Sequence, residues 1–320
     1  MRRALATLLA LAAPVALVAC GGDDQPEAGR QAPRPVTLAL DFSPNAAHSG
    51  IYAAVRERLD ERHGVALRVR EPVASTDSLK MLAAGRSDIS VVDIHDLGLA
   101  RERGADVVGV GALVQRPLAA VIAGPGTERP RDLAGKRVGV TGLPSDDAVL
   151  RAVLAADDAK LGDVKRTTIG FSAVPSLVAG KVDAVVAFWS VEGVALRRRG
   201  IRTREFRVDD YGAPAYPELV LVTTEQTLKE RRALVGDTLA ALRDGTEAAL
   251  ADQEATTSDL GRASGADPEL VRAELKAIAP ALTPPMRLDR TALEGWADFD
   301  ARFGILRERP DVDAAFPTTR

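Results

Sequence analysis

Four side chains that can bind a ligand lie close together in the stretch LDFSPNAAHSG at residues 40–50. Asp41 can accept hydrogen bonds from an amino group, Phe42 can stack on an aromatic ring, and Asn45 and His48 carry further polar groups. Each also has a structural interpretation, because Asp41 and Asn45 can cap the turn and the following helix, and Phe42 can belong to the core. For His48 we expect a capping or pocket-lining role, because the chain has three histidines and no spaced ligand set such as HExxH.

A second polar stretch, DIHDLG at residues 93–98, follows an apolar run that is typical of a buried strand. Strand alternation would place Asp93 and His95 on one face at the end of that strand. Together with His48 they offer side chains of the kinds that bind metals, but the stretch also fits a polar loop that faces a cleft. We favour the loop, predict no metal site, and count Asp93 and His95 as candidate ligand contacts.

Acidic residues also follow a strand in the second half of the chain. In GLPSDDAVL, residues 142–150, Ser145 or Asp146 caps a predicted helix and carboxylates occupy its first turn. An unoccupied helix N-terminus attracts sulfate, sulfonate or phosphate. Because carboxylates already fill this one, the sequence argues against an anionic ligand, and Asp146 joins the candidate contacts.

The stretch FWSVEG at residues 188–193 places an aromatic ring and a carboxylate just past a strand. A carboxylate can bind the edge of an aminopyrimidine, where an exocyclic amine lies beside a ring nitrogen, in a charge-assisted pair. Glu192 is our candidate for this contact and Trp189 for the cover of the ring face. In the structural alternative, Glu192 is a first-turn helix acid and Trp189 a core residue. Tyr216, in a later crossover segment, is a further candidate contact.

The sequence lacks motifs for catalysis and for nucleic-acid binding. It contains no Ser-His-Asp order, no P-loop and no GxGxxG after a strand, so we predict neither an enzyme nor a cofactor. The net charge is -3 and the pI is about 5.8, without a basic stripe interleaved with aromatics. Nucleic acid is therefore excluded as a partner.

The first twenty residues, MRRALATLLALAAPVALVAC, contain two arginines, an apolar stretch and the ending LVAC. This pattern predicts a lipoprotein signal peptide over residues 1–20. Cys20 is the only cysteine of 320 residues, so disulfides are excluded and lipid attachment is its predicted use. Residues 21–35 are polar and rich in Pro and Gly, which predicts a flexible tether. We expect an exported protein, anchored by lipid at the outer face of the cell membrane.

Along the rest of the chain, apolar runs of strand length alternate with helical patterns in two blocks. This predicts an α/β fold in which each block forms a mainly parallel sheet flanked by helices. The segments 81–93 and 176–188 share a Leu, Ala-Gly, a basic residue and an Asp before a strand, which predicts two lobes of one plan with Gly85 and Gly180 at helix ends. The predicted strands are 35–42, 65–72, 88–94, 136–142, 164–171 and 182–189, and the predicted helices are 48–64, 77–85, 146–157 and 174–180.

Two longer apolar segments, 107–126 and 205–224, lie between the blocks and after the second one. Each is long enough to leave one lobe and enter the other, so we predict two crossovers that form a hinge. The C-terminal third is helical and is expected to pack on the first lobe. Lobe one is therefore predicted to comprise 36–115 and 216–320, and lobe two 116–215.

The chain resembles the periplasmic-type solute-binding proteins of ABC importers. Four stretches carry this resemblance: LDFSPNAAHSGIYAA, LAAGRSDISV, FSAVPSLVAGKVDAVVAFWSVEG and VDDYGAPAYPELVLV. They look like the thiamine-pyrimidine-precursor branch, the NMT1-like (SsuA/THI5-like) group that includes formylaminopyrimidine-binding proteins. The resemblance runs from about Val36 to Thr224, and Phe42 stands where many relatives carry Trp. It implies a type II periplasmic-binding-protein fold, a heterocyclic ligand held between two lobes, delivery to permease and ATPase subunits, and a monomeric receptor.

The same branch contains an enzyme, the eukaryotic pyrimidine synthase, and His48 falls where that resemblance would place an important histidine. The enzyme resemblance also calls for a Cys-rich iron-binding stretch near the second crossover, where this chain reads AYPELVLVTT. We therefore expect a binding protein. Two other ligand classes stay open, a riboflavin-like heterocycle and an alkanesulfonate, and the acidic candidate residues disfavour the second.

Overall fold

The structure, a computed structural model, describes residues 32–317. The predicted signal peptide, Cys20 and most of the predicted tether lie outside the described residues. From Pro33 on, the chain forms one compact unit that contains two sheets. The first strand begins at Arg34, inside the predicted tether 21–35, because RPVTLA pairs along its whole length with the next strand.

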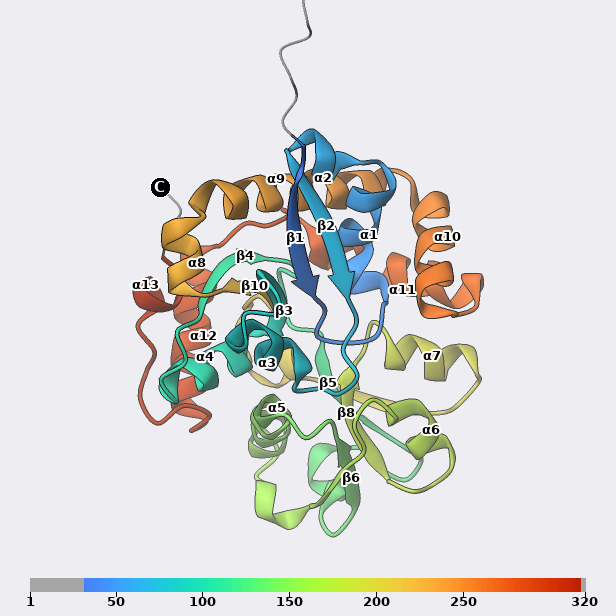
Figure 1. Cartoon of the computed structure of the whole chain (residues 1–320). Helices are drawn as coiled ribbons and strands as arrows, with labels where there is room; N and C mark the ends of the chain where they lie inside the picture. The colour runs from blue at the N-terminus through green and yellow to red at the C-terminus, as the bar shows by residue number, and fades with distance from the viewer. Residues whose placement is uncertain (1–31, 318–320) are drawn as a thin grey trace, which may run out of the picture. The chain divides into compact units, whose positions relative to one another are not determined.

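Each sheet has five strands, and the two sheets are built on one plan (Figure 1). The strands of the first sheet are β2 (Val65–Arg70), β1 (Arg34–Ala39), β3 (Ile89–Asp93), β10 (Leu219–Thr223) and β4 (Val108–Ala112), in that order. Those of the second are β7 (Lys165–Thr168), β6 (Arg137–Val140), β8 (Ala184–Phe188), β5 (Ala119–Ala123) and β9 (Arg204–Arg207). The predicted pair of α/β sheets is confirmed, and each sheet is mixed, because its fourth strand is antiparallel to both neighbours.

The antiparallel strands follow from the two crossovers. β4 of the first sheet leads into β5 of the second, and β9 of the second leads into β10 of the first. β4 and β9 run in the direction of the parallel strands, so both end at the edge where the sheets face each other. The chain then enters the other sheet from that edge and must run against its parallel strands. The predicted lobe boundaries at 115/116 and 215/216 fall near these crossovers and stay a prediction.

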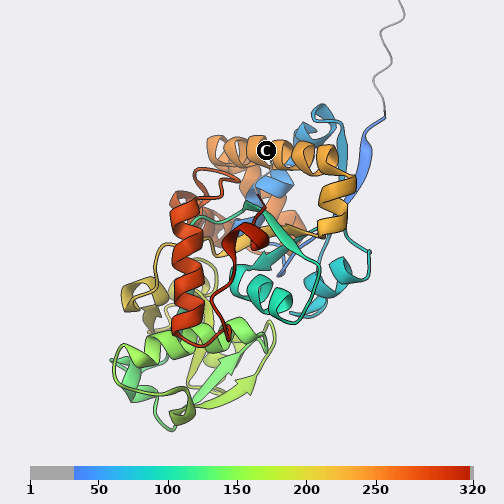
Figure 2. The ribbon, with the colours of Figure 1, turned by 90° about the vertical axis from the view of Figure 1, so that its left-hand side faces the viewer.

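Helices flank both sheets (Figures 1 and 2). Those before the second crossover are α1 (Ser49–Arg56), α2 (Leu59–Arg62), α3 (Asp77–Ala83), α4 (Ile94–Glu102), α5 (Pro144–Ala155), α6 (Ala173–Val178) and α7 (Glu192–Arg198). Those after it are α8 (Glu225–Glu230), α9 (Arg232–Ala251), α10 (Gln253–Ser264), α11 (Pro268–Ile278), α12 (Arg290–Arg302) and α13 (Val312–Ala315). Within residues 32–317, no helix has both the length and the apolar composition needed to span a membrane.

The C-terminal helices return to the first sheet. α9 packs against α1, α2 and β2, and the contact with α1 is so close that a Cβ on Gly245 would lie 2.2 Å from the carbonyl oxygen of Gly50. Only glycine fits there. α12 runs down toward the second sheet (Figure 2), and beyond its end Arg151 of α5 donates to the carbonyl oxygen of Gly304 at 2.8 Å. The C-terminal segment thus touches elements of both sheets.

Two local predictions have different outcomes. Gly85 and Gly180 end their helices with φ of 65° and 64°, which confirms the repeated helix-to-strand element. The single helix predicted over 48–64 is wrong, because a 3-10 turn (η1, Ala46–His48) precedes α1 and the chain breaks before α2 at Arg58, whose φ is 54°. A left-handed residue cannot continue a right-handed helix.

Candidate functional site

A cavity of about 320 Å³ lies where the carboxyl ends of the parallel strands of the two sheets meet. Its walls come from the segments that follow β1, β2, β3, β6, β7 and β8, and from the starts of β5 and β10. Ligands of open α/β sheets bind at this edge. Six candidate residues from the sequence analysis line the cavity: Asp41, Phe42, Asn45, Asp93, Asp146 and Glu192. The other four candidates are buried and do not line the cavity: His48, His95, Trp189 and Tyr216. That these four contact a ligand stays a prediction.

His48 supports the cavity wall from behind. Its ring is fully buried, and its Nε2 lies 2.8 Å from Oδ1 of Asp41. Its Nδ1 accepts a hydrogen bond from the backbone N–H of Asn45 at 3.3 Å, and Oδ1 of Asn45 accepts from the N–H of Ala47, which caps η1. His48 therefore uses both ring nitrogens within the protein and positions two lining residues, Asp41 and Asn45.

Asp93 and His95 separate at the end of β3, so the prediction that they share a strand face is wrong. Helix α4 begins at Ile94, and Asp93 becomes its N-cap by accepting from the N–H of His95 at 2.8 Å. Asp93 lines the cavity, whereas Nδ1 of His95 lies 2.5 Å from Oδ1 of Asp300 in α12. Strand alternation holds only where the backbone is extended, and that backbone ends at Asp93.

A buried group of charges lies behind this wall. Burial alone would lower the pKa of His95, but the carboxylates of Asp300, Asp93 and Glu218 raise it to about 10. His95 is therefore a buried cation at neutral pH. Burial raises the pKa of Glu218 and that of Asp93 to about 7. Tyr216 packs edge-on against the His95 ring, with 4.9 Å between the ring centroids, so it packs this group and lies behind the lining.

Glu192 fits both interpretations that the sequence left open, a first-turn helix acid and a residue that can contact a ligand. It is the first residue of α7, and its Oε2 accepts from the backbone N–H of Phe188 at 3.1 Å, while the residue also lines the cavity. Burial raises the pKa of Glu192 to about 7. A carboxyl group whose pKa is near 7 is present in both protonation states at neutral pH. It can therefore bind an amine and the neighbouring ring nitrogen either as a carboxylate or as an acid.

The aromatic part of the wall differs from the prediction. Trp189 is 9% exposed, its Nε1 donates to the carbonyl oxygen of Pro117 at 3.3 Å, and the guanidinium of Arg207 lies 4.3 Å from its ring centroid. The core interpretation of Trp189 is therefore the one its contacts support. Phe42 lines the cavity together with Phe171, and their ring centroids are 4.3 Å apart at an interplanar angle of 60°.

Asp146 fills the N-terminus of α5. Its Oδ2 accepts from the hydroxyl of Thr141 and the backbone N–H of Gly142, both at 2.9 Å, and from the N–H of Leu143 at 3.1 Å. The carboxylate thus occupies the donors that a bound anion would use. The neighbouring Ser145 donates its hydroxyl to Oδ2 of Asp96 at 3.0 Å, which links α5 of the second sheet to α4 of the first.

Glu218 and Phe171 are lining residues that the sequence analysis did not select. Phe171 follows β7, so its place just past a strand was a usable signal. Glu218 lies in the second crossover, two residues from Tyr216, and the choice between them depended on the path of that crossover. Local pattern does not give that path.

Comparison with solved structures defines the class of fold. The alkanesulfonate-binding protein SsuA from Xanthomonas axonopodis pv. citri, bound to MOPS, matches with a TM-score of 0.73 over 89% of this chain and 98% of that chain, at 21% identity. The periplasmic aliphatic sulphonate binding protein SsuA from Escherichia coli matches with a TM-score of 0.69 over 89% and 98%, at 17% identity. The chain therefore has the two-lobed fold of periplasmic binding proteins.

Sequence comparison defines the family. The profile described as "NMT1/THI5 like" matches residues 45–256, and the chain belongs to this family. The formylaminopyrimidine-binding protein of Halalkalibacterium halodurans is 32% identical over 209 residues, which are 64% of this chain and 62% of that protein. A putative thiamine biosynthesis protein of Haemophilus influenzae is 29% identical over 62% of this chain and 64% of its own length. A 4-amino-5-hydroxymethyl-2-methylpyrimidine phosphate synthase of Schizosaccharomyces pombe is 25% identical over 51% and 47%. The chain thus matches less than two thirds of each relative's length.

Proposed function

We propose that this protein is the extracytoplasmic solute-binding protein of an ABC importer, and that its solute is a thiamine pyrimidine precursor of the formylaminopyrimidine or hydroxymethylpyrimidine type. The observation that carries the proposal is the position of Glu192 at a cavity that Phe42 and Phe171 also line. The relative named for binding formylaminopyrimidine supports the same solute.

The chemistry of the cavity suits an aminopyrimidine. The edge of such a ring presents an amine N–H beside a ring nitrogen, and a carboxyl group meets both with its two oxygens. If the ring nitrogen takes the proton of Glu192, the contact becomes a charge-assisted pair, which is stronger than a neutral one. Aromatic side chains that pack against the faces of the ring add apolar contact. Asp41 and Asn45 offer further hydrogen-bonding groups on the first sheet's side.

An anionic solute fits the same cavity poorly. Asp146 already occupies the N-terminus of α5, and the lining carries six carboxyl groups. Transfer of a sulfonate into this field would add repulsion between like charges. This disfavours the alkanesulfonate alternative despite the fold shared with sulfonate-binding proteins.

Transport requires only a shift between open and closed arrangements of the two lobes. A solute that contacts both sheets stabilises the closed arrangement by its differential affinity. The hydrogen bond from Ser145 to Asp96 is one contact that such closure would form or break. In this proposal the closed receptor, a monomer held at the membrane by lipid on Cys20, delivers the solute to permease and ATPase subunits.

An enzymatic role of the synthase type is the weaker alternative. In that role His48 would have to reach the solute, yet it is fully buried behind the lining and both its ring nitrogens are engaged by Asp41 and Asn45. The stretch AYPELVLVTT at 215–224 also carries no cysteine that could bind iron. These observations favour a receptor.

Calorimetric titration of the purified full chain tests the proposal. The chain is unfolded and refolded once, to remove carried-over solute, and then titrated with formylaminopyrimidine, riboflavin and taurine in parallel. We expect one-to-one binding of the pyrimidine alone. Tight binding of riboflavin or taurine without the pyrimidine would overturn the assignment of the solute and leave a receptor role for another compound.

A further inference from the structure

Glu218 presents a buried oxygen that has no partner among residues 32–317. The side chain is 1% exposed and lines the cavity, and its Oε2 accepts from the backbone N–H of Leu118 at 2.7 Å. Its Oε1 is also buried but makes no hydrogen bond within the described chain. A buried oxygen without a donor is costly, so this position favours a ligand that brings one.

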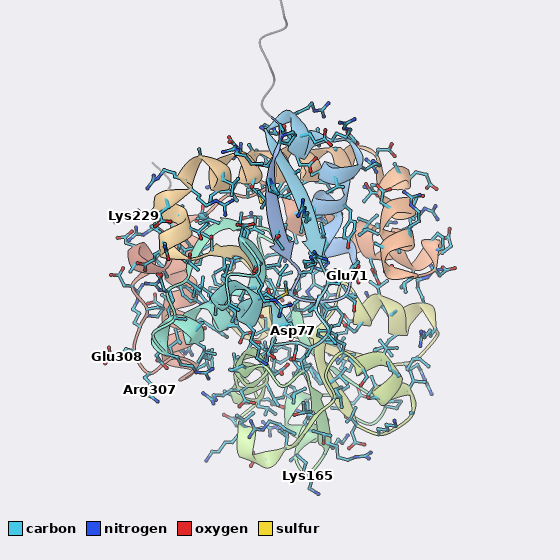
Figure 3. The ribbon with its side chains drawn as sticks, in the orientation of Figure 1. Glu71, Asp77, Lys165, Lys229, Arg307 and Glu308 are labelled. Carbon is cyan, nitrogen blue, oxygen red and sulfur yellow. The ribbon has the colours of Figure 1, made fainter. Side chains whose placement is uncertain are left out.

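In the lining of this cavity, the acidic groups are buried or half-buried and the basic groups are exposed. The carboxyl groups of the lining belong to Asp41, Asp93, Asp96, Asp146, Glu192 and Glu218, and each is buried or half-buried. The lining cations, Lys80 and Arg103, are both exposed, so water screens them. Lys165, Lys229 and Arg307 point outward from the molecular surface (Figure 3). The interior of the cavity is therefore acidic.

One buried cation faces this region from behind. Protonated His95 lies close enough to Asp93 and Glu218 for their charges to raise its pKa, but its direct partner at 2.5 Å is Asp300 of α12. Asp300 does not line the cavity, so its contact with His95 lies behind the wall. Within residues 32–317, neither Asp93 nor Glu218 forms a direct ion pair with a cation; their side chains accept from backbone N–H groups.

Glu218 and Glu192 are fixed to adjoining parts of one strand pair. Leu118 binds the carboxylate of Glu218 through its N–H and accepts from the N–H of Trp189 at 3.0 Å through its carbonyl oxygen. The residue before Trp189, Phe188, binds the carboxylate of Glu192. Both carboxyl groups therefore belong to the wall of one cavity beside the pair formed by β5 and β8, where a single solute can contact both.

On the basis of the proposed function, we infer that the cavity has a second acidic subsite, formed by Glu218 with Asp93, and that among thiamine pyrimidine precursors it favours the aminomethyl compound, whose side arm carries a protonated amine where the formylamino and hydroxymethyl compounds are neutral. The ammonium group donates to Oε1 of Glu218 and offsets the charge of Asp93. Burial raises the pKa of both carboxyl groups to about 7 in the empty cavity. Binding of a cation therefore releases part of a proton from them at pH 7, whereas a neutral side arm releases none from this subsite.

A pair of isosteric solutes tests the inference. The full chain is titrated by calorimetry at pH 7 with 4-amino-5-aminomethyl-2-methylpyrimidine and with 4-amino-5-hydroxymethyl-2-methylpyrimidine, which differ by one charge. We expect the amine to bind roughly 10-fold tighter or more, since a hydrogen bond to a charged group contributes about 1.5–3 kcal/mol. Titration in two buffers of different ionisation enthalpy is expected to show proton release with the amine only.

Variants separate this inference from the proposed function. In Glu218→Gln the amine is expected to lose its advantage, while the hydroxymethyl compound changes less than about 3-fold, within the effect of one neutral hydrogen bond. If Glu218→Gln does not fold, Asp93→Asn tests the same subsite. Glu269→Gln, on the exposed first turn of α11, is the matched control. If the hydroxymethyl compound binds as tightly as the amine, or if the preference survives in both variants, the subsite is overturned and the proposed function stands. If neither pyrimidine binds, the proposed function itself fails.

Discussion

Replacing Glu192 with alanine is expected to weaken binding of the formylaminopyrimidine roughly 100-fold or more, because it removes a two-point contact whose charge-assisted hydrogen bonds contribute about 1.5–3 kcal/mol each. Glu192→Gln is expected to lose only about 10-fold, since an amide still offers one acceptor and one donor to the neutral ring edge. Calorimetric titration of both variants beside the unmodified chain measures the two effects. The difference between them reports the charge assistance.

Two controls make this result specific. Glu269→Ala removes another acid from the first turn of a helix, but this side chain is 62% exposed and does not line the cavity, so binding is expected to be unchanged. Circular dichroism and thermal unfolding establish that the Glu192 variants fold. Binding by Glu192→Ala that equals that of the unmodified chain would remove Glu192 from the site.

The same carboxyl group makes stability depend on pH in a defined direction. Burial raises the pKa of Glu192 from an ordinary value of 4.5 to about 7. This group therefore costs the folded protein nothing below pH 4.5, where it is protonated in both states; the penalty builds up as the pH rises from 4.5 to about 7 and is complete above pH 7. In Glu192→Gln the penalty is absent, so chemical unfolding at pH 8 is expected to show a gain on the order of 1 to 3 kcal/mol. That gain is expected to vanish near pH 4.5.

Replacing Asp300 with asparagine is expected to lower the free energy of unfolding by about 3–5 kcal/mol at pH 6, because it leaves a buried charge on His95 without its direct partner. The two side chains are buried, at 1% and 0% exposure, and 2.5 Å apart. Asp300, together with Asp93 and Glu218, raises the pKa of His95 from 6.5 to about 10. Its stabilisation is therefore complete below pH 6.5 and is lost as the pH rises toward 10. Urea unfolding at pH 6 and pH 9.5 measures the change, which is expected to shrink at the higher pH.

Asp298→Asn is the matched control on the same helix. Asp298 pairs with Arg309 at the surface, where its side chain is 69% exposed, so its loss is expected to change the free energy of unfolding by less than about 0.5 kcal/mol. A pH-independent loss in Asp300→Asn would show that Asp300 acts by packing and that His95 is not a buried cation. Equal stability of Asp300→Asn and Asp298→Asn would contradict the role of the pair altogether.

Much of the fold could be predicted because its signals are local. The helix-to-strand element that ends at Gly85 and again at Gly180 depends on a glycine that can adopt positive φ, a property of one residue. The two crossovers could be placed because an apolar segment longer than one strand must serve two. The sheets were expected to be mainly parallel, and the antiparallel fourth strands arise from the point at which each crossover enters the other sheet, which is a tertiary property.

The candidate site was predicted in part for the same reason. Asp41, Asp93 and Glu192 lie just past the ends of parallel strands, and such positions face the cavity in any fold of this kind. Trp189 also lies past a strand end, but Arg207, eighteen residues away, covers its ring, and the side chain does not line the cavity. Glu218 lies in the same crossover as Tyr216 but could not be preferred over it, because only the paired sheets bring its carboxyl group to the N–H of Leu118, one hundred residues earlier in the chain.

We propose that the cavity between the two sheets binds an aminopyrimidine through Glu192. A crystal structure of the full chain grown with formylaminopyrimidine tests it most directly. We expect the ring inside the cavity, against Phe42 and Phe171, with its amine and the adjacent ring nitrogen about 2.7–3.2 Å from the two carboxyl oxygens of Glu192. A pyrimidine bound outside the cavity, or one whose amine edge faces away from Glu192, would contradict it.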